Sequence, residues 1–150
     1  MQSALNEAQK AFREREVPVG AVIVVDGQIV ASNHNRTEQW RDPIAHAEIL
    51  VIRDACEVLQ YERLAQASLY VTVEPCVMCA GALVLARIRR LVYGTENPKA
   101  GAICSLYNIV QDTRLNHQVE VISGVLQQEC RRLITSFFRQ LRTGEVPKWS

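Results

Sequence analysis

No stretch of the sequence approaches the ~18 consecutive apolar residues that a membrane-spanning helix needs, so we expect no membrane partner. The first residues, Met1 to Leu5, lack a basic region followed by an apolar core, which predicts no secretory signal and a cytoplasmic protein. Internal repeats, low-complexity tracts and interdomain linkers are also absent. The 150 residues are therefore expected to form a single domain, residues 1–150, whose core needs no covalent staples.

The sequence also has no marked excess of either charge, since its formal net charge is +1. A protein that holds nucleic acid by charge alone is normally far more basic, because each phosphate contact requires a lysine or arginine. We therefore expect any nucleic-acid partner to be bound through a local patch and specific contacts.

The cysteines are too few and too irregularly spaced for a disulfide framework. Their number is odd, and they stand at Cys56, Cys76, Cys79, Cys104 and Cys130. Metal binding by one pair, with the other three as small buried hydrophobes, fits this pattern better. The roles of Cys56, Cys104 and Cys130 stay open at this point.

Hydrophobic periodicity predicts strands that alternate with helices. The predicted helices are Ser3–Arg15, Ile44–Leu59, Pro75–Ala86 and Val125–Arg142. The predicted strands are Val19–Val25, Gln28–Ser32, Leu69–Val73, Arg90–Gly94 and Val119–Ile122. Asp26-Gly27 is a hairpin turn between the first two strands, and polar loops follow at Asn33–Pro43 and Thr95–Ala102. This order favours a three-layer α/β/α fold around a five-stranded mixed sheet with an antiparallel N-terminal hairpin.

Three side chains are suited to hold one Zn²⁺ per subunit: Cys76 and Cys79 at CxxC spacing, and His46 upstream. Three protein ligands leave the fourth tetrahedral position open, as in catalytic zinc sites. In the first turn of a helix the two cysteines would face the same way, and the positive helix end favours their thiolate forms. His46 and Glu48 could both lean past the start of a second helix.

Glu48 is the predicted catalytic residue. Two thiolates and a neutral imidazole offset the charge of Zn²⁺, so a nearby carboxylate is needed to help deprotonate a bound water. Glu48 would pass that proton to a ring nitrogen of a base and later protonate the departing ammonia. These residues predict hydrolytic deamination of an exocyclic amine.

Blander interpretations exist for each part of this pattern. A lone CxxC can be redox-active or half of a structural zinc site, and a lone H-x-E is often only a helix start. The sequence has no second CxxC or HxxxH that would complete a structural four-ligand site. The conjunction of the two parts therefore favours catalytic zinc.

The pattern H-x-E followed by P-C-x-x-C resembles the signature of zinc-dependent nucleobase deaminases. Longer runs make the chain similar to the bacterial tRNA adenosine deaminases over nearly its whole length. These runs are VPVGAVIV (17–24), DPIAHAEI (42–49), LYVTVEPCVMCAGAL (69–83), NPKAGA (97–102), NH (116–117) and ITSFFRQLR (134–142). The resemblance implies a cytidine-deaminase-like fold, a homodimer, and conversion of adenosine to inosine at the anticodon wobble position, usually of an arginine tRNA.

The resemblance also implies substrate-binding residues. Asn35 corresponds to an asparagine that hydrogen-bonds the flipped purine, and Ala47 is expected beside it. The positions that correspond to contacts with the anticodon loop are Lys99, Asn116, His117, Phe138 and Arg142. Without the resemblance, Asn35 could be an ordinary turn asparagine and Phe138 a side chain at the rim of the core. The arginines near Arg142 could equally form a solvated face or contact phosphates.

Asn97 departs from the family pattern, because most members have aspartate there. We hypothesise that this position lies near the sugar of the target nucleotide and reads its 2′-OH, the group that distinguishes RNA from DNA. Asparagine keeps an oxygen acceptor but loses the charge, so the contact should weaken. Relaxed discrimination against deoxy substrates is the expected result.

Three functions are compatible with the sequence: an RNA-directed adenosine deaminase, a deaminase of a free base such as guanine or cytosine, and a structural-zinc or redox binding module. The Phe137-Phe138 pair, Arg142 and the NPKAGA loop favour the first, because a free base needs no such outer contacts. Glu48 separates an enzyme from a binding module. The identity of the tRNA and the arrangement of the dimer stay open, and no further protein partner is expected.

Overall fold

The computed structural model describes residues 1–146, and the last four residues of the predicted 1–150 domain lie outside the described part. In chain order the elements are α1 (Gln2–Arg13), β1 (Gly20–Val25), β2 (Gln28–His34), α2 (Thr37–Trp40), α3 (Ala47–Leu59), β3 (Ser68–Val73), α4 (Val77–Leu85), β4 (Arg90–Thr95), β5 (Glu120–Ile122) and α5 (Gln127–Thr143). No helix within residues 1–146 is long and apolar enough to cross a membrane.

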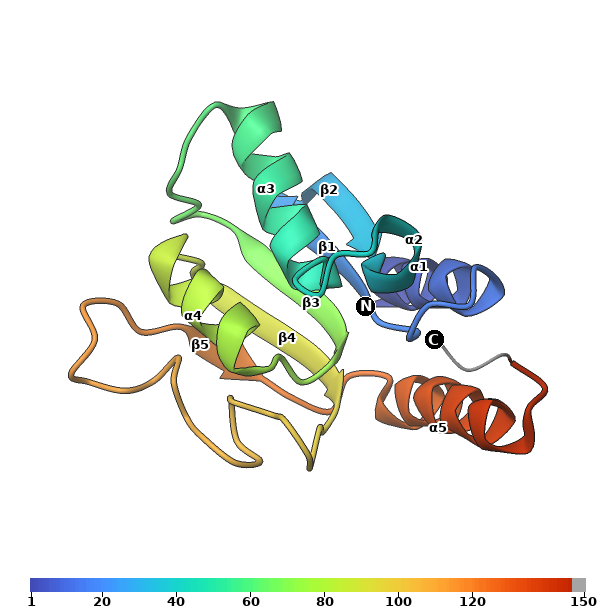
Figure 1. Cartoon of the computed structure of the whole chain (residues 1–150). Helices are drawn as coiled ribbons and strands as arrows, with labels where there is room; N and C mark the ends of the chain where they lie inside the picture. The colour runs from blue at the N-terminus through green and yellow to red at the C-terminus, as the bar shows by residue number, and fades with distance from the viewer. Residues whose placement is uncertain (147–150) are drawn as a thin grey trace.

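The five strands form one sheet in the order β2-β1-β3-β4-β5 (Figure 1). Strand β1 pairs antiparallel with both β2 and β3, while β3, β4 and β5 run parallel. The predicted mixed sheet of five strands with an N-terminal hairpin is therefore confirmed. Because β3 and β4 are parallel, the chain leaves both at the same edge of the sheet.

Helices α3 and α4 lie side by side over one face of the sheet (Figure 1). Alternate residues of the central strands point to this face, as the period of two requires. Ala21 and Ile23 of β1 pack there in one cluster with Val51 of α3 and Leu83 of α4, and all four are fully buried. This core fixes the starts of α3 and α4 relative to the end of β3.

Helices α1 and α5 cover the opposite face and contact each other. Two glycines of the strands permit the close approach of these helices to the sheet. A Cβ on Gly20 of β1 would overlap main-chain atoms of Ala4 and Ala8 in α1, and one on Gly94 of β4 would overlap Cys130 in α5. The three-layer α/β/α arrangement is thus present, with helices packed on both faces of the sheet.

Several predicted boundaries need correction. Helix α1 ends at Arg13 rather than Arg15, whose φ of 63° is left-handed. Helix α3 begins at Ala47 rather than Ile44, because the N-cap residue His46 is still extended. Helix α4 begins at Val77 rather than Pro75, because Cys76 is the extended N-cap.

The polar segment 33–43 is not only a loop. Strand β2 continues through it as far as His34, and the short helix α2 follows. The buried carboxylate of Glu16 accepts the first-turn N–H groups of Glu38 and Gln39, at 3.1 and 2.7 Å. This long-range cap stabilises α2 where the local sequence shows no helical periodicity.

Candidate active site

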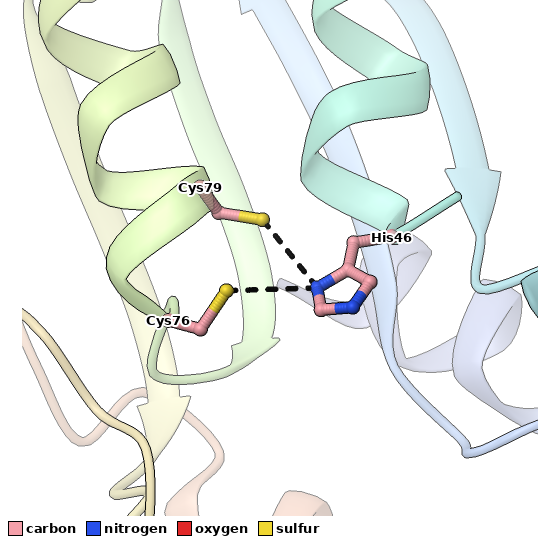
Figure 2. Close-up of side chains that lie close together, drawn as sticks. All are labelled: His46, Cys76 and Cys79. Atoms are coloured by element: carbon pink, nitrogen blue, oxygen red, sulfur yellow. Dashed lines mark hydrogen bonds between the residues drawn. The ribbon is translucent and has the colours of Figure 1, made fainter. Parts of the chain in front are cut away.

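The three predicted metal ligands converge at the starts of two helices. His46 is the N-cap of α3, Cys76 is the N-cap of α4, and Cys79 lies in the first turn of α4. Figure 2 shows both sulfurs directed at the histidine ring, with Nδ1 3.7 Å from Sγ of Cys76 and 3.6 Å from Sγ of Cys79. Zinc bonds of ~2.3 Å to sulfur and ~2.1 Å to nitrogen place two such tetrahedral ligands about 3.6 Å apart.

The trio therefore fits a tetrahedral zinc ion in both ligand type and spacing. Within residues 1–146 it is the one group of histidine, cysteine and carboxylate side chains close enough together to hold a metal ion. Soft thiolates with one imidazole are a donor set that zinc prefers. Three protein ligands would leave the fourth tetrahedral position of a bound zinc ion for water or substrate.

The thiols of the trio differ sharply in acidity. A hydrogen bond from Cys79 lowers the pKa of Cys76 to about 4, against the opposing effect of burial, and His46 contributes a further hydrogen bond. The same pairing, with burial, raises the pKa of Cys79 far above its usual range. The hydrogen bond to Cys76 raises the pKa of His46. A divalent cation would take the place of these shared protons.

Glu48 is buried beside the trio, with 4% of its surface exposed. Burial is the main cause that raises the pKa of this carboxyl to about 7. A carboxyl with such a pKa can both accept and release a proton near neutral pH. Glu48 therefore has the location and the acidity that a proton shuttle requires.

A pocket of about 250 Å³ adjoins the trio, and five of the predicted site residues line it. They are Asn35, His46, Glu48, Cys76 and Asn97. Ligand sites are typically concave, mostly apolar and supplied with a few well-placed polar groups, as here. The structure thus brings two of the three candidate metal ligands, the predicted proton shuttle and two predicted substrate-binding residues to one cavity, whose lining does not include Cys79.

Asn35 is held firmly at the wall of this pocket. The side-chain Oδ1 accepts the N–H of Ala47 at 2.8 Å, and the main-chain N–H of Asn35 donates to the carbonyl of Val19 at 3.1 Å. Its Nδ2 makes no hydrogen bond to any residue within 1–146, so the amide can donate to a ligand. Ala47 is fully buried and supports Asn35 from behind, without lining the pocket.

Six further residues that line the pocket were not predicted from the sequence. These are Val17, Val19, Thr37, Val73, Glu74 and Ala100. The apolar ones carried no signal that separates a pocket wall from ordinary core. Glu74 did carry one, because it is an acidic residue placed directly after a buried strand and before Pro75-Cys76.

Glu74 is 2% exposed and accepts a set of hydrogen bonds from the loop that follows β4. Burial alone would raise the pKa of its carboxyl. Hydrogen bonds from Ser105, Cys104 and Asn97 outweigh that effect and hold the pKa below its ordinary value. Glu74 is therefore a buried carboxylate whose charge is satisfied by protein donors.

Three predicted RNA contacts lie on the surface. Lys99 is exposed on the same loop as Asn97, and Phe138 and Arg142 are exposed on α5. The ring of Phe138 is 38% exposed and meets Phe137 edge to face, with centroids 5.6 Å apart. Phe137 is fully buried, so of this aromatic pair Phe138 is the one able to stack on a ligand.

Asn116 and His117 are not brought to the pocket within one chain. The Arg87 guanidinium donates to the carbonyl of Asn116 at 2.8 Å, and a ring nitrogen of His117 lies 2.8 Å from the carbonyl oxygen of Ile88. Arg87 and Ile88 precede β4, whereas Asn97 follows it. Asn116 and His117 therefore lie near the start of β4, at the opposite end of this strand from the pocket.

Comparisons with known proteins identify the family of this chain. The MafB19-like deaminase family matches residues 1–142. The tRNA-specific adenosine deaminase of Bacillus subtilis is 51% identical over 142 residues, which cover 95% of this chain and 88% of that protein. The protein of the same name from Agrobacterium fabrum is 49% identical over 145 residues, covering 97% of this chain and 95% of that protein.

Solved structures of deaminases are similar to this chain. One from work on A-to-I editing by tRNA:A34 deaminases at the wobble position of transfer RNA has a TM-score of 0.86 at 49% identity, covering 89% of this chain and 96% of that chain. A guanine deaminase from Nitrosomonas europaea has a TM-score of 0.78 at 21% identity, covering 91% and 81%, and so shares the fold. The fold is cytidine-deaminase-like, and the chain belongs to the MafB19-like deaminase family and to the tRNA-specific adenosine deaminases.

Proposed function

We propose that residues 1–150 form one zinc-dependent domain that converts adenosine to inosine at the wobble position of a tRNA anticodon, an arginine tRNA by resemblance, in the cytoplasm. The observation that carries the proposal is the buried carboxyl of Glu48 beside the His46–Cys76–Cys79 trio, on the wall of a pocket that Asn35 also lines. Similarity to tRNA-specific adenosine deaminases over 95% of the chain supports the nucleotide and its carrier.

The protein's own residues account for the proton transfers. Bound by His46, Cys76 and Cys79, Zn²⁺ would supply the Lewis acidity that makes water a nucleophile at neutral pH. Glu48 accepts the proton that the attacking water loses and delivers it to a ring nitrogen of adenine. Glu48 then accepts the second proton, from the hydroxyl group added to the ring carbon, and passes it to the exocyclic amine as the C–N bond breaks and ammonia departs. Water and adenosine are consumed, and inosine and ammonia are produced.

Pocket and surface residues are proposed to hold the RNA. Asn35 donates from Nδ2 to the flipped base, and its other contacts fix the amide in that orientation. Lys99 and Arg142 are placed for phosphates and Phe138 for stacking on an unpaired base. Asn116 and His117 are also proposed RNA contacts, but only if a second copy of the chain, or RNA reaching around the sheet, spans the distance to the pocket.

Asn97 is proposed to face the sugar of the target nucleotide. Its side chain is half-buried on the pocket wall, and its Oδ1 accepts the N–H of Ala100 at 3.2 Å. An uncharged acceptor that is already engaged in this way should read a 2′-OH less strongly than a carboxylate. Reduced discrimination between RNA and DNA follows from this proposal.

A homodimer is proposed because α4 lacks a polar face. Its sequence, VMCAGALVL, is apolar all round, and such helices are normally covered on every side. Yet Val77 is 51% exposed and Leu85 is 81% exposed. A second copy of the chain packed on α4 would bury both side chains.

Incubation with total bacterial tRNA followed by sequencing tests the proposed function. We expect adenosine-to-inosine conversion at the first anticodon position of one tRNA, and none without bound zinc. Parallel reactions with free guanine, cytosine and adenosine identify the competing activity. Turnover of a free base with no inosine in any tRNA would contradict the proposal and favour the free-base deaminase.

A further inference from the structure

We infer that Glu74 is a positioning residue, which holds the loop 97–105 as a wall of the pocket and thereby sets how tightly the target nucleotide is bound. The inference rests on the proposed function and adds to it a determinant of substrate affinity that takes no part in the chemistry. It is carried by a single carboxylate that joins three features: the end of β3, the loop after β4 and the pocket surface.

One oxygen of the carboxylate binds the far end of the loop. Oε2 accepts the N–H groups of Ile103, Cys104 and Ser105 at 3.1, 3.0 and 3.0 Å. Three consecutive amides directed at one oxygen form a nest of the kind that binds anions. Their convergence requires a negative charge or a strong acceptor at this point.

The other oxygen binds the near end of the loop. Oε1 accepts the N–H of Asn97 at 3.2 Å and the hydroxyl of Ser105. A single buried side chain therefore holds both ends of a segment that contains no helix or strand. Because hydrogen bonds to an ionised acceptor are stronger than neutral ones, Glu74 is a strong anchor for the N–H of Asn97, whose carbonyl separately accepts the N–H of Gly101.

The same loop is attached by its backbone to the segment that carries a candidate zinc ligand. The N–H of Ala102 donates to the carbonyl of Pro75 at 2.9 Å, and Cys76 forms an isolated β-bridge with Gly101. A Cβ on Gly101 would overlap the Glu74 carboxylate, so glycine is required for this close packing. The backbone contacts fix the middle of the loop, and Glu74 fixes its two ends.

The loop matters for binding because Asn97 and Ala100 both line the pocket. If Asn97 loses its hydrogen bond to Oε1, its carbonyl still accepts the N–H of Gly101 at 2.7 Å, but its own N–H is no longer held and its place on the pocket wall is less firmly fixed. The ligand trio should be unaffected, because none of its side chains contacts this part of the loop through an identified hydrogen bond within residues 1–146. Substrate affinity and zinc binding should therefore respond differently to changes at Glu74.

Glu74→Gln tests this directly. The glutamine oxygen can replace Oε2 and keep the three amides of residues 103–105, but its NH₂ group then faces the N–H of Asn97, donor against donor. The substitution thus releases Asn97 selectively. We expect KM for an RNA hairpin with adenosine at the wobble position to rise by about tenfold or more. Zinc should remain at one per chain, and kcat should change less than KM.

Leu64→Ala is the matched control for lost stability. Leu64 is 3% exposed in the core, away from the pocket lining, so its truncation lowers the fraction folded without altering the pocket. KM should stay within about twofold of wild type at a comparable drop in Tm. If Glu74→Gln does not fold, Ser105→Ala removes only the hydroxyl donor to Oε1, and KM should then rise about threefold.

Amide hydrogen exchange separates the possible outcomes. The Asn97 amide of Glu74→Gln should exchange at least about tenfold faster than in wild type, with residues 103–105 still protected. A KM within twofold of wild type, with Tm lowered as in Leu64→Ala, would reduce Glu74 to a structural role and overturn the inference. Failure of wild type itself to form inosine would refute the proposed function, while unchanged Asn97 exchange would refute the anchoring separately.

Discussion

At the scale of single residues, the site depends on groups whose surroundings fix their chemistry. Glu48 is protonated more readily than an ordinary glutamate because it is buried, and Asn35 offers one amide nitrogen because Ala47 occupies its oxygen. The ligand trio and Glu48 were predictable from residue types and spacing. The role of Glu74 was not, although its place directly after a buried strand was a signal, because its partners are 23 to 31 residues away in an irregular loop.

Asn97→Asp tests how the pocket reads the sugar. The change should raise the preference for an RNA hairpin over a matched DNA hairpin, because a carboxylate accepts a hydrogen bond from the 2′-OH more strongly than an amide oxygen. We expect the ratio of the two kcat/KM values to increase by about tenfold. The active fraction of enzyme cancels in this ratio, so an unchanged ratio would remove Asn97 from sugar recognition.

At the scale of helices and strands, the sequence located every strand of the sheet. The buried strands β1, β3 and β4 carry nearly continuous apolar runs, whereas the more exposed β2 was located by the Asp26-Gly27 turn before it. The starts of α3 and α4 were predicted three and two residues too early, because the proline near each start marks the boundary only approximately. Helix α2 escaped prediction because its cap comes from Glu16, far away along the chain. Local patterns therefore predict elements well, but not the contacts that join them.

A cluster of titratable side chains, with Glu7 and His34 buried at its centre, joins α1 to the end of β2. The ring nitrogens of His34 lie 2.7 and 2.8 Å from carboxylate oxygens of Glu7 and Glu14, and Lys10 pairs with Glu7 at 2.6 Å. Burial raises the pKa of Glu7, but hydrogen bonds from Lys10 and His34 outweigh it and leave the pKa below its ordinary 4.5. Asn35, which lines the pocket, directly follows His34 in the chain, so this cluster adjoins the pocket wall.

The cluster predicts a pH-dependent stability. Because the pKa of Glu7 is lower in the folded state, its contribution is fully present above pH 4.5 and is lost as pH falls through the folded value. Glu7→Gln should lower the free energy of unfolding by about 1–2 kcal/mol at pH 7, and by less as the solution is acidified below pH 4.5. Urea unfolding at several pH values measures this, with the exposed Glu57→Gln as control. A constant difference across pH would contradict the assignment.

At the scale of the whole molecule, the exposed apolar side of α4 requires an explanation that one chain does not supply. The sheet, the hydrophobic core and the pocket all lie within residues 1–146, yet Leu85 is the most exposed of the large hydrophobic residues there. The homodimer was predicted from the family resemblance alone. The sequence of an apolar helix does not show whether the helix is covered by its own chain or by a second copy. Only the observed exposure separates the two cases.

Leu85→Glu tests the dimer. A charge placed in an apolar interface would be desolvated without a partner, so we expect the protein to become monomeric at micromolar concentration. Sedimentation equilibrium measures the change. Val58→Glu is the matched control, because Val58 is 63% exposed on α3 and should tolerate the charge without altering the assembly. A wild-type protein that is monomeric under these conditions would exclude the proposed interface.

Glu48 is proposed to transfer protons beside zinc held by His46, Cys76 and Cys79. A comparison of wild type and Glu48→Ala for zinc content and for inosine formation in an anticodon hairpin tests this. We expect one zinc per chain in both proteins, and a fall in turnover of at least about 10²-fold in the variant. Turnover of Glu48→Ala within a few-fold of wild type, with zinc bound, would contradict this proposal.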